Sequence, residues 1–217
     1  MCPGRACGWL QKVAIAAFLI AATGCGESAA PAMLVETTDP VTVNGHAVHA
    51  LPTAPISLAA GDALEVGPKG MARLLYPDGS RFMLMSRDAE PASLAVTARA
   101  ADAGHVVIKL LKGVLAFLVP PDRKVKDRYE LKALNTVTTI EGTAGRVITT
   151  VAEDSVALEH GTVLVVANGG EQTRIKGLQE AIFNLLAGKF KLLSYDPTAT
   201  GEKDLYSGSE DKKILNH

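Results

Sequence analysis

The chain has 217 residues, with 22 basic and 23 acidic side chains and a formal net charge of −1. This balance argues against a nucleic-acid-binding protein, which usually carries a basic excess or a basic stripe. Apolar residues make up 47% of the chain and aromatic residues 5%. The apolar share is sufficient for the core of one domain of ordinary size with flanking tails.

Residues 1–24 have the pattern of a secretory signal peptide. Arg5 and Lys12 give a positive start, and an uncharged apolar run follows from Val13 to Ala22. The run is shorter than the ~20 residues that a transmembrane helix needs, whereas its length suits the core of a signal peptide. An uncleaved N-terminal anchor helix is the alternative interpretation.

The apolar run ends in Ala22-Thr23-Gly24-Cys25, a sequence that resembles the lipobox of bacterial lipoproteins. In that motif the cysteine receives a diacylglyceryl group, later acyl chains such as palmitate, and becomes the new N-terminus. Cys25 has no downstream thiol as a disulfide partner, because Cys2 and Cys7 both precede the run. We therefore predict a lipid anchor on Cys25, in the outer membrane if the cell has one, followed by a tether over residues 25–40. Simple secretion is the alternative.

Residues 41–102 carry two hairpin patterns. Asn44-Gly45 lies between two short apolar runs and suits a type I′ turn, because both residues tolerate positive φ. The turn Pro77-Asp78-Gly79-Ser80 separates two longer apolar runs. The Ala-rich stretch 88–102 is expected to be a loop or a short helix. The strands predicted in this region are 41–43, 46–48, 63–66, 71–76 and 81–85.

Residues 106–176 continue the β pattern. Short runs rich in β-branched residues alternate with turn residues at near-regular spacing. This pattern predicts an all-β fold of many short strands, as a β-sandwich, a roll or a short β-solenoid. Strand–Gly–strand units at Gly113 and Gly161 favour a coiled arrangement, and we expect a hairpin at Gly161. The predicted strands are 106–111, 114–119, 129–134, 136–140, 146–151, 155–158, 162–166 and 173–176.

From Leu178 the apolar period changes to that of a helix. Leu178, Ala181, Ile182 and Leu185 would share one helical face, and Gly188 would end the helix. We expect residues 178–195 to form a helix with an apolar extension that caps the β-domain. A helix that contacts a partner or a membrane is the alternative. Residues 196–217 are predicted to be a polar, mobile tail.

The order of motifs from about Leu64 to Glu180 resembles the FecR domain, a periplasmic module named after a ferric-citrate sensor. The resemblance implies a β-domain, here residues 41–177, that binds or scaffolds without catalysis. In the sensors, a cytoplasmic segment controls a sigma factor; we do not expect that role here, because so few residues precede the apolar run. The segments that carry the resemblance are Val66-Gly67 with Ala72–Ser80, Leu110–Val114, Tyr129–Leu131 with Ile140–Thr143, and Val156–Val163 with Ile175–Gly177.

The sequence predicts no enzyme, no metal and no cofactor. His46 and His49 would point to opposite faces of a strand, and a metal site needs several converging ligands. Asp78, Glu141 and Asp154 fall at turns, where acidic residues commonly bond the local backbone. A pair of carboxylates for glycoside cleavage is therefore not expected.

One charge feature stands out, the basic run Arg123, Lys124, Lys126 and Arg128. It is either a solvated loop or an electrostatic contact to an anionic envelope polymer or lipid headgroups. We predict an exported, lipid-anchored, non-catalytic binding or scaffolding module. Its partners would be the membrane, through Cys25, and an envelope protein or glycan. A secreted structural module for envelope assembly or secretion is the alternative, and a glycan-active enzyme is disfavoured.

Overall fold

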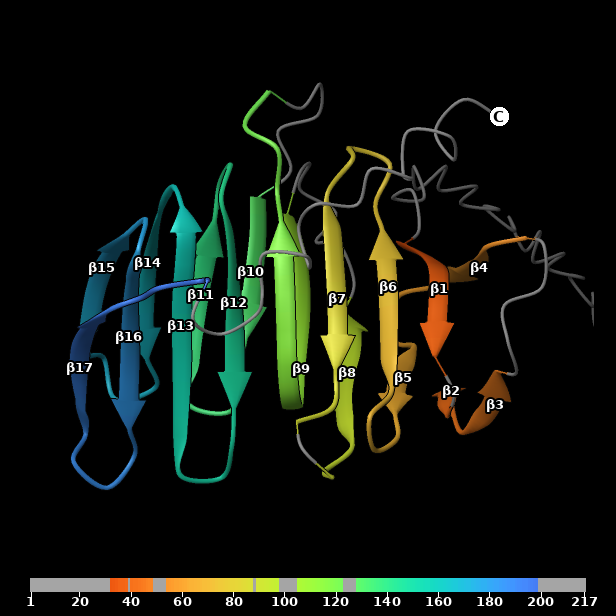
Figure 1. Ribbon diagram of the computed structural model, residues 1–217, viewed down its shortest axis with the longest axis horizontal. Coiled ribbons are helices and arrows are strands. Elements are labelled where there is room, and N and C mark those ends of the chain that lie inside the picture. Colours follow the sequence, from red (N-terminus) through yellow and green to blue (C-terminus); the bar gives the residue numbers. More distant parts are fainter. Residues whose placement is uncertain are drawn as a thin grey trace, which may run out of the picture.

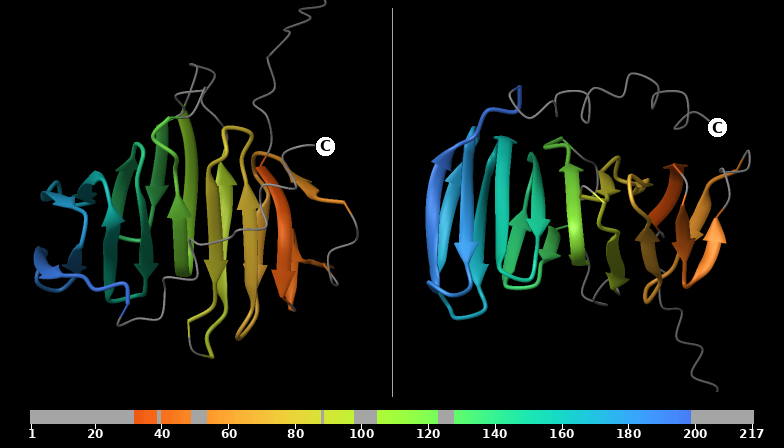
Figure 2. Two further views of the ribbon diagram at one scale, coloured as in Figure 1. Left: turned by 45° about the horizontal axis from the view of Figure 1, so that its top comes forward. Right: turned by 60° about the horizontal axis from the view of Figure 1, so that its bottom comes forward.

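The computed structural model describes residues 32–38, 40–48, 54–87, 89–97, 105–122 and 128–198. In this part of the chain all regular elements are β-strands, seventeen in number. They form two sheets that stack face to face, as Figures 1 and 2 show. The predicted all-β fold is therefore confirmed.

The first sheet, much of which faces the viewer in Figure 1, contains nine strands that pair antiparallel throughout. Their order across the sheet is β4 (Ile56–Leu58), β1 (Ala32–Thr38), β6 (Met71–Leu75), β7 (Arg81–Met85), β9 (His105–Leu118), β12 (Ala144–Thr149), β13 (Glu153–His160), β16 (Gln179–Asn184) and β17 (Lys189–Ser194).

The second sheet also has nine strands, because β9 belongs to both sheets. The pair β9–β10 is parallel, and the other pairs described in this sheet are antiparallel. The order is β3 (His46–Val48), β2 (Val41–Val43), β5 (Ala63–Val66), β8 (Ala92–Thr97), β9, β10 (Arg128–Lys132), β11 (Thr136–Ile140), β14 (Thr162–Ala167) and β15 (Gln172–Lys176).

Strand β9 passes from the second sheet to the first at Gly113. Its first half pairs with β8 and β10, and its second half pairs with β7 and β12. Gly113 has φ +101°, and a Cβ atom there would lie 2.2 Å from the Cβ of Ala92. Only glycine relieves both the backbone strain and this overlap. The two strands predicted on either side of Lys112-Gly113 are thus one strand of 14 residues.

Gly161 marks a second crossing, where the hairpin prediction is wrong. Strand β13 lies in the first sheet and β14 in the second, so the two strands do not pair with each other. Gly161 has φ +91°, and a Cβ atom there would lie 2.2 Å from Cγ2 of Thr143. At each strand–Gly–strand unit the chain therefore crosses from one sheet to the other. The fold thus has features of both the sandwich and the coiled alternatives.

The core fills the space between the two sheets. On β5, Leu64 and Val66 are fully buried while Glu65 between them is exposed, as the strand period requires. The same alternation recurs along β10, where Tyr129 and Leu131 are buried. One contiguous apolar cluster results, which contains residues from both sheets.

The turns that connect the strands gather at two opposite edges of the sandwich. The edge at the top of Figure 1, here called the upper edge, contains the turns 76–80, 119–122 and 141–143. The opposite lower edge contains the turns 86–91, 133–135, 150–152 and 185–188, together with the Gly113 crossing. Strand β1 runs downward in this view, so Ala32, where the described chain begins, lies towards the upper edge.

Two segments that were not predicted to form strands contain them. Within the predicted tether 25–40, residues 32–38 form β1, which pairs with β4 and β6 and buries Leu34 completely. Within the stretch 88–102, residues 92–97 form β8 between β5 and β9. Pairing partners distant in sequence give these segments their conformation, and a local pattern does not reveal such partners.

The predicted helix over 178–195 is wrong. Strand β16 pairs with β13 and with β17 along its length, and it buries Ala181 and Phe183 with the period of a strand. The residues that would continue the helix instead form a turn, in which Gly188 has φ +62° and donates its N–H to the carbonyl of Asn184. The segment that was expected to cap the β-domain as a helix is therefore the β-hairpin of strands β16 and β17.

Candidate functional site

The outer face of the second sheet carries Arg128, the described residue of the predicted basic run, together with other charged side chains. On β10, Arg128, Glu130 and Lys132 point outward because Tyr129 and Leu131 between them point into the core. The parallel neighbour β9 places His105 beside Arg128 in the register. Local alternation on two strands therefore gathers these groups on one surface.

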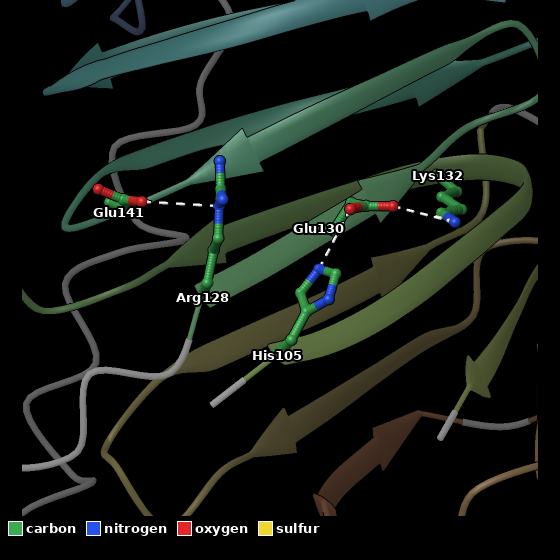
Figure 3. A network of polar contacts seen from close by, with 5 residues as sticks. All are labelled: His105, Arg128, Glu130, Lys132 and Glu141. Atoms are coloured by element: carbon green, nitrogen blue, oxygen red, sulfur yellow. Dashed lines mark ion pairs between the residues drawn. The ribbon is translucent and has the colours of Figure 1, made fainter. Parts of the chain in front are cut away.

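Figure 3 shows the polar contacts on this face. Nε2 of His105 lies 3.1 Å from one oxygen of Glu130, and Nζ of Lys132 lies 3.0 Å from the other. Nε of Arg128 lies 3.6 Å from Oε1 of Glu141, and both of these side chains are more than half exposed. An exposed pair at this distance contributes little stability, so the guanidinium of Arg128 can exchange Glu141 for another anion.

A shallow pocket of about 250 Å³ opens next to Arg128. The register aligns Thr139, Leu164 and Arg174 in one row across β11, β14 and β15. The row brings a second guanidinium to the pocket, and threonine side chains supply hydroxyl groups. Two arginines with hydroxyl donors suit a phosphate or carboxylate group, which guanidinium can bind through two parallel hydrogen bonds. The pocket is lined by Arg128, Thr139, Glu141, Thr162, Val163, Leu164 and Arg174.

The whole outer face over strands β9, β10, β11, β14 and β15 has an excess of positive charge. It presents five Lys or Arg side chains and two Glu side chains, so it would attract anions over a distance set by ionic strength. The cations are Lys109, Arg128, Lys132, Arg174 and Lys176, and the anions are Glu130 and Glu141.

Of the predicted basic site, the structure places Arg128, as the first residue of β10. Arg123, Lys124 and Lys126 lie outside the described residues, as do the signal segment 1–24, Cys25 and the tail beyond residue 198. Sequence reasoning missed Arg174 and Lys109, because neither belongs to a dense run of cations in the sequence. The sheet order is what brings them to one face.

The acidic residues singled out by sequence have structural partners. Asp78 accepts hydrogen bonds from the backbone N–H and hydroxyl of Ser80, both at 2.9 Å, and from the hydroxyl of Tyr129 at 2.9 Å. Burial raises the pKa of Tyr129 well above its usual range; a hydrogen bond with Ser80 lowers it and the charge of Asp78 raises it further. Burial, and then Asp78, likewise raises the pKa of Tyr76. Both tyrosines remain protonated at neutral pH, and Tyr129 donates its hydroxyl hydrogen to Asp78.

The described residues contain no group of three or more His, Cys, Asp or Glu side chains placed to hold a metal ion. His46 lies exposed on β3, and its predicted neighbour His49 lies outside the described residues. In the described part of the chain, no helix is long and apolar enough to cross a bilayer.

Fold and site together define a two-sheet β-module with a basic face. The family model FecR protein matches residues 62–164, from the start of β5 into β14. The chain therefore contains a FecR domain, and the resemblance drawn from its motifs is confirmed. This assignment supports a non-enzymatic module of the cell envelope.

The fold is similar to two crystal structures, at 1.65 and 2.50 Å resolution, of a protein from Parabacteroides distasonis ATCC 8503 described as a candidate anti-sigma factor. The TM-scores are 0.51 and 0.52 at 15% sequence identity, with 63% and 64% of this chain covered. The match spans 62% and 63% of those chains, and at this identity the likeness is one of fold. No curated protein matches the sequence.

Proposed function

We propose that this protein is an exported envelope lipoprotein that binds an anionic partner through the outer face of its second sheet and does not catalyse a reaction. The observation that carries the proposal is the convergence of Arg128 and Arg174 on one pocket within a face of net positive charge. The FecR domain and the lipobox-like sequence before Cys25 support the envelope location.

The geometry of the chain start fits this proposal. Six residues lie between Cys25 and Ala32, and an extended chain spans at most about 25 Å from one to the other. A lipid on Cys25 would therefore hold the upper edge near the bilayer. Arg128, the last residue of the basic run, begins β10 at the same edge. The positive face would then lie close to lipid headgroups and to polymers near the membrane surface.

The anchor is tested by intact mass and membrane partition of the full chain expressed in a bacterium, beside Cys25→Ala. We expect the wild type to begin at Cys25, to carry acyl mass and to sediment with membranes, and the variant to do none of these. If both proteins are soluble with unmodified cysteines, the lipoprotein assignment is wrong and the secreted alternative replaces it.

The binding face is tested with Arg128→Ser/Arg174→Ser in the purified mature protein. Probes are an anionic polysaccharide, polygalacturonate, and vesicles of phosphatidylglycerol with phosphatidylethanolamine. We expect one of them to bind with an affinity that falls with salt, and the double variant to weaken it about tenfold, since each exposed charge contact contributes up to about 1 kcal/mol.

The matched control is Lys189→Ser/Lys191→Ser, which removes two exposed charges from β17 at the far edge of the first sheet. It should leave the affinity unchanged. Equal weakening by both double variants would mean that net charge alone drives binding, and no binding to either probe would overturn the assignment of this face.

A further inference from the structure

A second and larger pocket, of about 590 Å³, opens on the lower edge of the sandwich. Three aliphatic side chains from separate elements line it: Leu111 is 43% exposed, Leu134 48% and Val151 84%. They come from the end of the first half of β9, from the β10–β11 turn and from the β12–β13 turn. The pocket is therefore assembled from both sheets.

The apolar surface continues beyond this pocket to the β16–β17 turn. The N–H of Leu185 donates to the carbonyl of Ala152 at 3.1 Å, which places this turn beside the turn that carries Val151. Leu185 is 49% exposed and Leu186 is 95% exposed. Of the eight large apolar side chains exposed in the described residues, five lie on this one edge, so the exposure is a patch and not the usual scatter.

A buried carboxylate holds the pocket in shape. Asp154, which is 1% exposed, accepts hydrogen bonds from the backbone N–H of Asn135 at 2.7 Å, from the hydroxyl of Thr136 at 3.0 Å and from the hydroxyl of Thr149. Thr149 in turn accepts the N–H of Leu134 at 3.3 Å. The β10–β11 turn of one sheet is thus tied to the end of β12 in the other.

This network means that Leu134 and its neighbours are presented on fixed turns. A preorganised surface loses little conformational entropy when a partner binds, and that raises affinity. At the rim, Nζ of Lys112 pairs with Oε2 of Glu90 at 2.9 Å, and Arg87 also lines the pocket. An apolar centre with a charged rim is the usual anatomy of a protein–protein interface.

We propose that the lower edge is a docking surface for a protein partner that inserts an aliphatic or aromatic side chain among Leu111, Leu134 and Val151. The choice of a protein, and not a lipid, follows from where the N-terminal chain meets the fold. The described chain begins at Ala32, towards the upper edge. A lipid on Cys25 would direct the lower edge away from the bilayer, and in this respect the inference rests on the proposed anchor.

The first experiment places a photo-crosslinking amino acid in the full chain in living bacteria, at Val151 or at Leu186. The control position is exposed His160, at the upper end of β13. We expect both lower-edge positions to give the same protein adduct, which His160 does not give and which Leu134→Ser removes. Adducts of lipid, or of a second copy of this chain, would overturn the proposal, as would the absence of any adduct.

The second experiment uses the protein identified in that adduct, purified, with the mature wild type and variants. We expect Leu134→Ser/Val151→Ser to weaken binding at least about tenfold, as truncation of central interface residues does, and His160→Ser at the upper edge to leave binding unchanged. The replaced side chains are exposed, and thermal melting checks that the variants fold. Equal affinities of wild type and double variant would overturn the proposal.

These measurements separate the two proposals. Arg128→Ser/Arg174→Ser leaves the lower edge intact, so it should not change the binding of the protein partner. The crosslinks do not require a lipid on Cys25, and they can therefore succeed if the protein is simply secreted.

Discussion

The upper and lower edges of the sandwich each contain a hydrogen-bonded aspartate, but the surfaces around the two aspartates differ. At each edge an aspartate accepts at least three hydrogen bonds: Asp78 from Ser80 and Tyr129 above, and Asp154 from Asn135, Thr136 and Thr149 below. In both cases the carboxylate joins segments distant in sequence. The two networks therefore fix the turns that close the sheets.

The difference lies in what covers each network. At the upper edge the rings of Tyr76, Phe82 and Tyr129 pack together with centroids 5.1–5.4 Å apart, and all three are buried. At the lower edge the neighbouring side chains are Leu134 and Val151, which remain exposed. Aromatic packing completes the core at one end, whereas the other end keeps an apolar surface for a partner.

The largest effect is expected from Asp154→Ala. Three buried or partly buried donors would lose their acceptor, and each buried donor left without a partner costs about 1–3 kcal/mol. We expect the free energy of unfolding to fall by roughly 3–5 kcal/mol, measured by urea denaturation. The comparison is Asp78→Ala, which should cost less because Asp78 is only half-buried and water can replace it. The reverse order would mean that the deeper burial of Asp154 does not decide the cost of losing the carboxylate.

Tyr129→Phe should have a smaller effect at the upper edge. It removes the 2.9 Å hydrogen bond to Asp78 but keeps the ring in the aromatic cluster, so we expect a loss of about 1–2 kcal/mol. Tyr76→Phe is the matched control, because the buried Tyr76 hydroxyl has no hydrogen-bond partner among the residues that the structure describes. That variant should be neutral or slightly stabilising in urea denaturation. Equal losses in the two variants would mean that the hydroxyl of Tyr129 does not stabilise the fold.

The sequence correctly predicts the turns whose conformation depends on the residues within them. The hairpin at Asn44-Gly45 and the turn at 77–80 have residues that suit their backbone conformations, and both occur as predicted. The strand–Gly–strand pattern indicated a coiled chain, and Gly113 shows why, since the glycine allows β9 to change sheets.

Elements that depend on distant partners were not predictable in this way. Strand β8 lies in an Ala-rich stretch, and β16 has leucines at helical spacing, yet both form strands because sheet neighbours pair with them on both sides. The candidate site shows the same limit. Arg128 belongs to a visible basic run, whereas Arg174 lies on a strand whose position depends on the sheet order. Asp154 was predicted to be a turn residue, because the sequence alone does not show that the fold places Asn135 and Thr149 beside it.

The smallest and most selective prediction concerns alkaline pH. Burial raises the pKa of Tyr76 and of Tyr129 in the folded protein, whereas tyrosines in the unfolded chain titrate near ~10. A raised pKa in the folded state contributes stability that is fully present below the unfolded value and is lost as the pH rises above it. The contribution of these two tyrosines to the free energy of unfolding should therefore stay constant up to about pH 10 and decrease at higher pH.

Hydrogen exchange would connect this loss to one edge of the molecule. Amides around Asp78 should lose protection before the amide of Asn135, because the tyrosines that resist ionisation both lie at the upper edge. In absorbance titrations, part of the tyrosinate signal should appear only together with unfolding, and Tyr76→Phe/Tyr129→Phe should remove that part. If the double variant keeps the same alkaline transition, ionisation of Tyr76 and Tyr129 is not the cause of the loss of stability, and the upper edge is not the more alkali-sensitive one.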